Sequence, residues 1–335
     1  MGLGRRPGTR APGDRRQRRH RREPAVGAAG GRAGRNHAAG VPAVLRAGRG
    51  GLGIRHRGAP AAGRRRLDPQ PPALEREFAA GIDAFLLCNP HNPHGVVFDR
   101  ATLVELARIA AKHDVFVVSD EIHAPLTHPG VTFTPFAPLA AAAGGRAAIV
   151  TSASKGWNIA GAKCAIIVAA DAATADLLNL LPEEVACRTS ILGLHANIVA
   201  FRSTDWLDET VERIVANDRL LDELLRAELP AAVYHRPRAG YLAWLDLRGL
   251  GLGESPHTRI LHEARVALND GASFGSGGAG FARLNLACSP ETLREAVTRI
   301  ADLVARVAGV AEGGAATTTE AATTEGTGDA AHRAA

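Results

Sequence analysis

The chain has 335 residues, of which 46% are hydrophobic and 22% are charged, enough for the core of one large or two ordinary domains. Its four cysteines are widely spaced, at Cys88, Cys164, Cys187 and Cys288. This spacing excludes a CxxC-type zinc site and indicates a reducing compartment. No apolar run reaches the length of a membrane span, so the sequence predicts a cytoplasmic protein without membrane contact.

The net charge of +6 is unevenly distributed along the chain. Residues 1–66 contain 18 arginines and two acidic residues, a local balance of +16, which leaves −10 for the rest. This segment has no aromatic residue and few apolar ones, so we expect a disordered, basic, low-complexity segment. A nucleic-acid-binding arm is the alternative interpretation, but no aromatic residues are interleaved to stack on bases, which disfavours it.

From Leu67 onward, short apolar runs alternate with helical patterns. Apolar periodicity predicts helices at 73–80, 101–113 and 171–181, the second one capped by Asp99. Strands are predicted at 82–88, 115–118, 147–150 and 164–169. This alternation predicts an α/β fold with a three-layer, doubly wound and mostly parallel sheet, in a large domain over 67–205.

The second half of the chain predicts a smaller α+β domain over 206–310. Helical patterns cover 206–229, 259–268 and 291–307, a strand pattern covers 241–247, and the Gly-rich stretch 271–287 leads into another strand. Residues 311–335 are rich in Ala, Thr, Gly and Glu, so a disordered tail is expected there. His113 and His128 are expected at the surface.

Three polar residues come just after predicted strands: Asn92, Asp120 and Lys155. In doubly wound sheets ligands bind at the carboxyl ends of the strands, so this coincidence predicts a site. The chain has three lysines against 37 arginines, which suggests that Lys155 is used for its amine, a group that can form a Schiff base. Each residue also has an ordinary interpretation: a surface lysine, a turn asparagine and a helix-capping aspartate.

Several motifs in the same order carry a family resemblance. They read NPHNPHG at 89–95, SDEIHAPL at 119–126, SASKGWNIAGAKCA at 152–165 and LNDGASFGSGGAGFARLNLACSP at 268–290, with weaker support from ILGLHAN at 191–197 and YLAWLD at 241–246. Over residues 67–310 the chain resembles the fold-type I pyridoxal-phosphate enzymes of the class I/II aminotransferase superfamily. Within that superfamily it is most similar to the cystathionine β-lyase-like (MalY/PatB-type) C–S lyases.

The resemblance implies pyridoxal 5′-phosphate as cofactor and assigns residues to it. Lys155 matches the lysine that holds the cofactor covalently and later moves the Cα proton. Asp120 matches the carboxylate that pairs with the pyridine nitrogen, and Asn92 matches the amide that bonds the ring's phenolic oxygen. Ser152 and Lys163 match phosphate-contacting positions, although many aminotransferases have arginine at the second one.

The resemblance also implies a substrate and a branch of the family. Arg283 matches the arginine that clamps the α-carboxylate of an amino-acid substrate. His123 stands where aminotransferases usually have tyrosine, and the C–S lyase branch tends to have histidine, in contact with the cofactor or with Asp120. The implied reaction is a β-elimination from a sulfur-containing amino acid that yields thiol, pyruvate and ammonia, in a homodimer.

The first hundred or so residues of such enzymes normally supply a phosphate cup, a ring stacked on the cofactor and much of the dimer interface. Residues 1–66 supply none of these, and the resemblance begins abruptly at Arg66-Leu67-Asp68. We therefore expect an atypical or frameshifted N-terminus and an incomplete cofactor-binding domain. Two other functions stay open: an aminotransferase on the same scaffold, and an inactive fragment or basic-armed binding protein.

Overall fold

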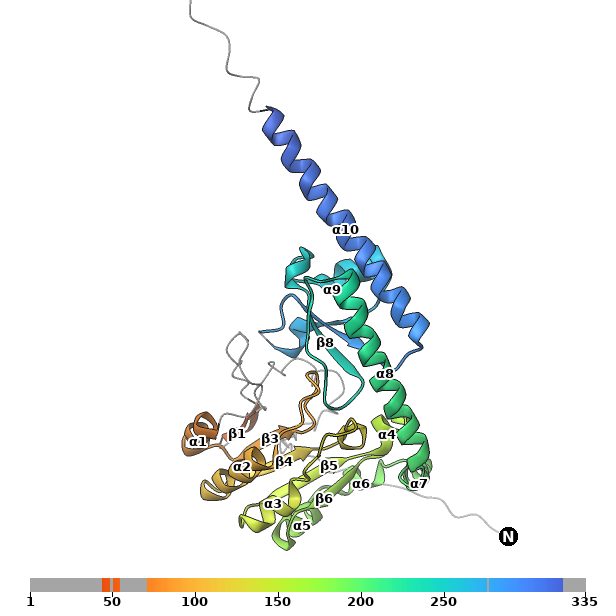
Figure 1. The fold of residues 1–335 in the computed structure, drawn as a ribbon. Helices are drawn as coiled ribbons and strands as arrows, with labels where there is room; N and C mark the ends of the chain where they lie inside the picture. Colours follow the sequence, from red (N-terminus) through yellow and green to blue (C-terminus); the bar gives the residue numbers. More distant parts are fainter. Residues whose placement is uncertain (1–43, 49–50, 55–70, 276, 322–335) are drawn as a thin grey trace, which may run out of the picture. The chain divides into compact units, whose positions relative to one another are not determined.

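The computed structural model describes residues 44–48, 51–54, 71–275 and 277–321. The described residues form two sheets, one with six strands in the order β2-β1-β3-β4-β5-β6 and one with four in the order β7-β8-β10-β9 (Figure 1). The strands of the larger sheet are β1 (Val44–Gly48), β2 (Gly51–Ile54), β3 (Ala84–Cys88), β4 (Phe116–Asp120), β5 (Ala147–Thr151) and β6 (Ile166–Ala169).

Parallel pairing is confined to the centre of the larger sheet. Strands β3, β4 and β5 pair in parallel, whereas β1 with β2, β1 with β3, and β5 with β6 are antiparallel. The sequence predicts a mostly parallel sheet, and the structure differs at both flanks. Strand β6 returns antiparallel because the connection 152–165 holds only short helical turns, too little for the crossover that a parallel neighbour needs.

The predicted elements around β3 and β4 form because their apolar residues fall at the right period. In β3, Phe85 and Leu87 alternate inward and are fully buried. Helix α2 (Arg100–Lys112) begins at Asp99, whose Oδ1 accepts a hydrogen bond of 2.7 Å from the backbone N–H of Thr102. The helices of this half are α1 (Pro71–Ala79), α2, α3 (Ala137–Ala142), α4 (Ala153–Gly156), α5 (Ala172–Asn179), α6 (Glu183–Cys187) and α7 (Ile191–Ala200).

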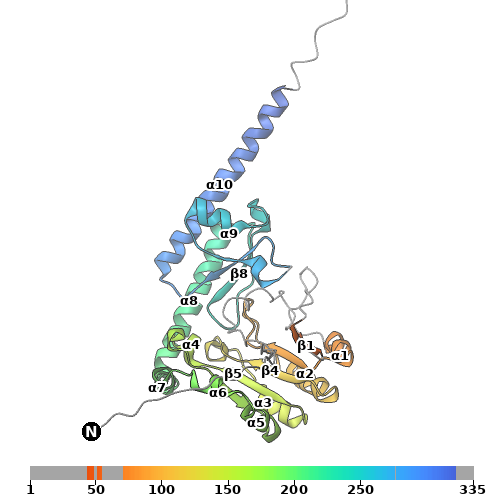
Figure 2. The same cartoon turned by 180° about the vertical axis from the view of Figure 1, so that it is seen from behind.

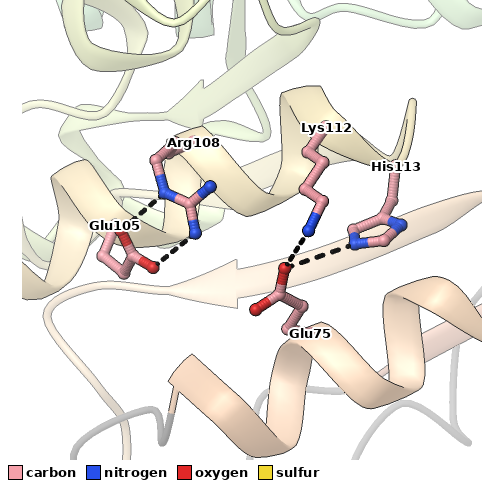
Figure 3. Close-up of polar contacts among 5 residues, drawn as sticks. All are labelled: Glu75, Glu105, Arg108, Lys112 and His113. Carbon is pink, nitrogen blue, oxygen red and sulfur yellow. Dashed lines mark hydrogen bonds and ion pairs between the residues drawn. The ribbon is translucent and has the colours of Figure 1, made fainter.

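Helices α1, α2 and α3 pack side by side against the sheet, with α2 between the other two (Figures 1 and 2). Polar pairs link the outer sides of α1 and α2: Glu75 Oε1 accepts from Lys112 Nζ at 2.7 Å and lies 3.7 Å from His113 Nε2 (Figure 3). The bond from Lys112 lowers the pKa of Glu75. Such exposed pairs contribute little to stability, so the apolar core beneath them holds the helices on the sheet.

The smaller sheet is antiparallel and packs against two long helices. Its strands are β7 (Val233–Tyr234), β8 (Leu242–Asp246), β9 (Asn269–Asp270) and β10 (Phe281–Asn285). Helices α8 (Thr204–Glu228) and α10 (Pro290–Ala321) pack on each other and share one apolar core with the sheet (Figure 1). A short helix α9 (Pro256–Arg259) runs into a π-helical turn at Ile260–Ala264, so the predicted helix at 259–268 ends early.

Two segments that composition predicts to be disordered contain regular structure. Strands β1 and β2 lie inside residues 1–66, where β1 pairs with the outer edge of β3 through Val44–Phe85 and Leu45–Ala84. Helix α10 continues past residue 310 to Ala321, in a stretch without proline. The remaining residues of 1–66 and 311–335 lie outside the described residues. In the part of the chain that the structure covers, no helix is both long and apolar enough to cross a bilayer.

Candidate functional site

The carboxyl ends of the three parallel strands lie level with one another. Asp120 ends β4 and pairs in register with Cys88 of β3 and Val150 of β5. Its Oδ1 accepts a 3.1 Å hydrogen bond from the backbone N–H of Ile122, which orients the carboxylate in the turn after the strand. Burial, and then the charge of Asp120, raise the pKa of the Cys88 thiol to about 12, so this thiol stays protonated beside the carboxylate.

Lys155 lies on the short helix α4, directly after β5, and its side chain is half-buried. The helix begins at Ser152, whose Oγ accepts from the backbone N–H of Ser154 at 3.0 Å and donates to the carbonyl of Cys164 at 2.6 Å. At the other end, Trp157 Nε1 donates to the carbonyl of Ser203 at 3.0 Å. The turn that carries Lys155 is therefore held at both ends.

The sequence reasoning missed Asn197, which holds the start of this turn. Asn197 lies on α7 and is buried; its Oδ1 accepts from the backbone N–H of Ala153, and its Nδ2 donates to the carbonyl of Gly193, both at 2.8 Å. A buried amide inside an otherwise apolar helix was the available signal, because buried polar groups need partners. ILGLHAN was read only as part of the family resemblance.

Asn92 and Arg283 come together from opposite halves of the chain. Asn92 follows β3, Arg283 lies in the middle of β10, and Arg283 Nη1 donates to Asn92 Oδ1 at 2.9 Å. The amide oxygen of Asn92 is thereby occupied, and its Nδ2 is the atom that can donate to another group. The structure thus joins a predicted cofactor residue to the predicted carboxylate clamp.

His123 is buried between two positive charges. Burial, and then the charges of Lys155 and Arg283, lower the pKa of His123 to about 4, so the imidazole is neutral at neutral pH. Its ring centroid lies 6.1 Å from that of Tyr241, and the electrostatic effect of Arg283 extends to Tyr241 as well. Tyr241 is a second residue that the sequence reasoning did not single out.

The two predicted phosphate contacts, Ser152 and Lys163, lie in different surroundings. The hydroxyl proton of Ser152 is committed to the carbonyl of Cys164, and the side chain is buried. Lys163 is exposed, and its backbone is left-handed with φ of 55°. The bond from Ser152 to Cys164 keeps the two segments adjacent, but a phosphate contact by Ser152 or Lys163 stays a prediction.

Residues 238–240, which precede β8, are hydrogen-bonded to the loops that follow β3 and β4. The N–H groups of Arg238 and Ala239 donate to the carbonyl of Gly95, and that of Gly240 donates to the carbonyl of Leu126. His128, expected at the surface, is instead buried, with its Nε2 2.8 Å from the carbonyl of Gly240. These bonds tie the loops after β3 and β4 to the segment just before β8, which contains Tyr241. A small recess lies between them, lined by Asn92, His123, Gly240 and their neighbours.

A larger groove than this recess lies elsewhere in the described part of the chain. It has a volume of about 310 Å³ and runs between residues 265–268 and helix α10. Its lining contains none of the predicted site residues. We place the candidate site at the strand ends, because Asp120 ends β4, Asn92 follows β3 and Lys155 follows β5, and these three groups carry more chemical information than the size of a groove.

The donor set at the strand ends fits pyridoxal 5′-phosphate. An anionic carboxylate suits a protonated ring nitrogen, an amide donor suits a phenolate oxygen, and a half-buried primary amine suits an aldehyde. Asp120, Asn92 and Lys155 supply these groups. Arg283, hydrogen-bonded to Asn92, adds a cation beside this donor set.

Comparison with known proteins shows the family to which the chain is similar. The profile of the family "Aminotransferase class I and II" matches residues 70–300. The cystathionine beta-lyase of Corynebacterium glutamicum is 40% identical over 232 residues, which cover 69% of this chain and 62% of that protein. Cystathionine beta-lyase PatB of Bacillus subtilis is 34% identical over 250 residues, covering 68% and 64% of the two chains.

A solved structure extends the likeness to the fold. Cystalysin from Treponema denticola, which contains pyridoxal 5′-phosphate, superposes with a TM-score of 0.63 at 26% identity, covering 71% of this chain and 61% of that one. The predicted α/β fold class is thereby confirmed. The chain spans about three-fifths of the length of the curated relatives that it matches.

Proposed function

Because this chain belongs to the class I and II aminotransferase family, we propose that it is a pyridoxal-phosphate-dependent C–S β-lyase. Its substrate is an amino acid with sulfur at Cβ, such as cystathionine, and its products are a thiol, pyruvate and ammonia. The observation that supports the proposal is the position of Asp120, Asn92 and Lys155 at or just after the carboxyl ends of neighbouring parallel strands, with Arg283 hydrogen-bonded to Asn92. Relatives named cystathionine beta-lyase favour this reaction over transamination.

Three residues would hold the cofactor. Asp120 pairs with the ring nitrogen, Asn92 donates to the ring oxygen, and the Nζ of Lys155 makes the covalent attachment. When bound, pyridoxal phosphate supplies an electron sink for the charge left at Cα. Ser152 and Lys163 stay the proposed phosphate contacts, and for Ser152 the bond to Cys164 has to be exchanged for the phosphate.

The protein's own groups bind the substrate and move its proton. Arg283 receives the α-carboxylate, and the amine of Lys155 removes the proton from Cα. The Cβ–S bond then breaks, its electron pair leaves with the thiolate, and water hydrolyses the resulting enamine to pyruvate and ammonia. His123 is neutral because of burial and the two nearby cations, so it adds no further positive charge beside Lys155.

We also propose that the chain acts as a homodimer in the cytoplasm. Large apolar side chains are exposed along residues 167–206, among them Leu180 at 78%, Leu192 at 77%, Ile191 at 64% and Val199 at 63%. Contiguous exposed apolar surface of this kind usually marks an interface. The four free cysteines fit a reducing compartment.

The test separates cofactor binding from reaction. The full chain is incubated with pyridoxal phosphate and reduced with borohydride, and the adduct is located by peptide mass spectrometry, in the wild type and in Lys155→Ala and Lys112→Ala. We expect an adduct at residue 155 that disappears only in Lys155→Ala. Pyruvate release from cystathionine supports the lyase, whereas a new amino acid formed from an added keto acid supports an aminotransferase. A chain with no adduct at Lys155 refutes the proposal.

A further inference from the structure

The guanidinium of Arg283 is held from three directions. Asn269 Oδ1 accepts from its Nε at 3.3 Å and from its Nη2 at 3.0 Å, and Asn92 Oδ1 accepts from its Nη1 at 2.9 Å. The ring of Phe274 lies under the plane, 4.6 Å from Cζ. We infer that Asn269 and Phe274 are positioning residues that orient Arg283 so that its Nη1/Nη2 end receives the substrate carboxylate.

The count of donors supports this orientation. A guanidinium has five N–H groups, one on Nε and two on each terminal nitrogen. Asn269 uses the edge formed by Nε and Nη2, and Asn92 uses one N–H of Nη1. One N–H on Nη1 and one on Nη2 remain, which suits a carboxylate at the end of the fork. The inference rests on the proposed function, because it takes the ligand of Arg283 to be an amino-acid carboxylate.

Strand pairing explains why Asn269 reaches Arg283. The two residues face each other across β9 and β10, and Trp244 of β8 faces Arg283 from the other neighbouring strand. Residues directly opposite in a sheet point to the same side. Asn269 is therefore a fixed neighbour of Arg283, set by the register of the sheet.

The Gly-rich stretch places the aromatic ring. The backbone at Gly271 passes against that at Gly278 so closely that a Cβ on either one would overlap the other's carbonyl. This approach folds the loop back and buries Phe274, whose ring packs edge-on against Trp244 at 5.4 Å between centroids. The glycines of this stretch thus fix an aromatic ring under Arg283.

A second arginine, Arg248 in the turn after β8, shows what a purely structural ion pair looks like. Arg248 lies over Phe281 at 4.8 Å, but its partner is the carboxylate of Asp246, at 2.8 Å and 2.6 Å. Its charge is compensated within the protein. The partners of Arg283 are two neutral amides, so its charge is oriented without being neutralised. An oriented cation with amide partners is suited to an anionic ligand.

The first experiment places a carboxylate where Asn269 has its amide. In the cofactor-loaded full chain, Asn269→Asp is expected to raise KM for cystathionine about tenfold, equal to about 1.4 kcal/mol, with kcat changed less than about twofold. Asn285→Asp adds the same charge to β10 away from Arg283 and is expected to keep the wild-type KM. Equal KM values for Asn269→Asp and the wild type would overturn the inference.

The second experiment needs no catalysis, so it separates this inference from the proposed function. Phenylglyoxal labels accessible guanidinium groups, and peptide mass spectrometry gives the rate at Arg283. Asn269→Ala and Phe274→Leu are expected to raise that rate about threefold or more, because each removes an interaction of Arg283. Asn285→Ala and Phe281→Leu are the matched controls. A raised rate without lyase activity supports the inference and counts against the function; an unchanged rate overturns the inference, whatever the activity.

Discussion

The hydrogen bonds of Asn197 predict how strongly the lysine turn, residues 152–157 with Lys155, depends on helix α7 for its stability. Asn197→Ala removes the acceptor of the backbone N–H of Ala153 and leaves that buried donor without a partner. An unsatisfied buried donor costs about 1–3 kcal/mol, and the lost packing of the amide adds to this. We therefore expect the free energy of unfolding to fall by about 2–3 kcal/mol.

The assay combines stability with the chemistry of Lys155. Urea unfolding of the full chain gives the free energy, and borohydride trapping with pyridoxal phosphate gives the fraction of Lys155 labelled under native conditions. Asn217→Ala is the matched control, because Asn217 is also buried and donates to the carbonyls of Leu286 and Cys288 in the smaller domain. Both variants should lose stability, but only Asn197→Ala should lose labelling.

If Asn197→Ala lowers the free energy of unfolding by less than about 0.5 kcal/mol, the reasoning is refuted, because an ordinary surface substitution has an effect of that size. Equal labelling in Asn197→Ala and the wild type would show that the turn keeps its position without the bond to Ala153.

Two further predictions concern pH and helix capping. Unfolded His123 takes up a proton near pH 6.5 and the folded residue only near pH 4, so stability is unaffected above pH 6.5 and falls by up to about 3 kcal/mol as the pH drops from 6.5 to 4. In His123→Asn, the free energy of unfolding measured in urea should fall less steeply between pH 6.5 and 4. Part of the fall should remain, because burial also lowers the pKa of His94 to about 4. An unaltered pH dependence in His123→Asn would contradict the prediction. Asp99→Ala should lower the free energy of unfolding by about 1 kcal/mol, because it removes the side-chain cap on the backbone N–H of Thr102. Asp99→Asn keeps a capping oxygen and should stay close to the wild type. Equal losses of stability in both variants would exclude capping as the cause.

Local features of this fold could be predicted from sequence. The cap at Asp99, the period of α2 and the inward alternation of β3 depend on residues within a few positions of each other, and the structure contains all three. The position of Asp120 at the end of β4 follows from the same logic. A short apolar run bounded by polar residues defines a strand and its end without knowledge of its neighbours.

Pairings between distant segments could not be predicted in this way. The antiparallel return of β6 depends on the path of a connection, not on the composition of the strand. The bond from Ser152 to Cys164 and the burial of His128 depend on which carbonyl comes to lie opposite. The assignment of Arg283 came from the family resemblance, and its contacts with Asn92 and Asn269 come only from the packing of three segments.

The bond between Asn92 and Arg283 spans 191 residues of sequence, which has a consequence for biosynthesis. During translation the strands of the larger sheet emerge and can pair long before Arg283 leaves the ribosome. Closing so long a loop costs entropy before any contact compensates for it, so we expect this corner of the molecule to mature last. A nascent chain arrested before β10 would carry the lysine turn but no clamp, and would be a substrate for chaperones rather than a working catalyst.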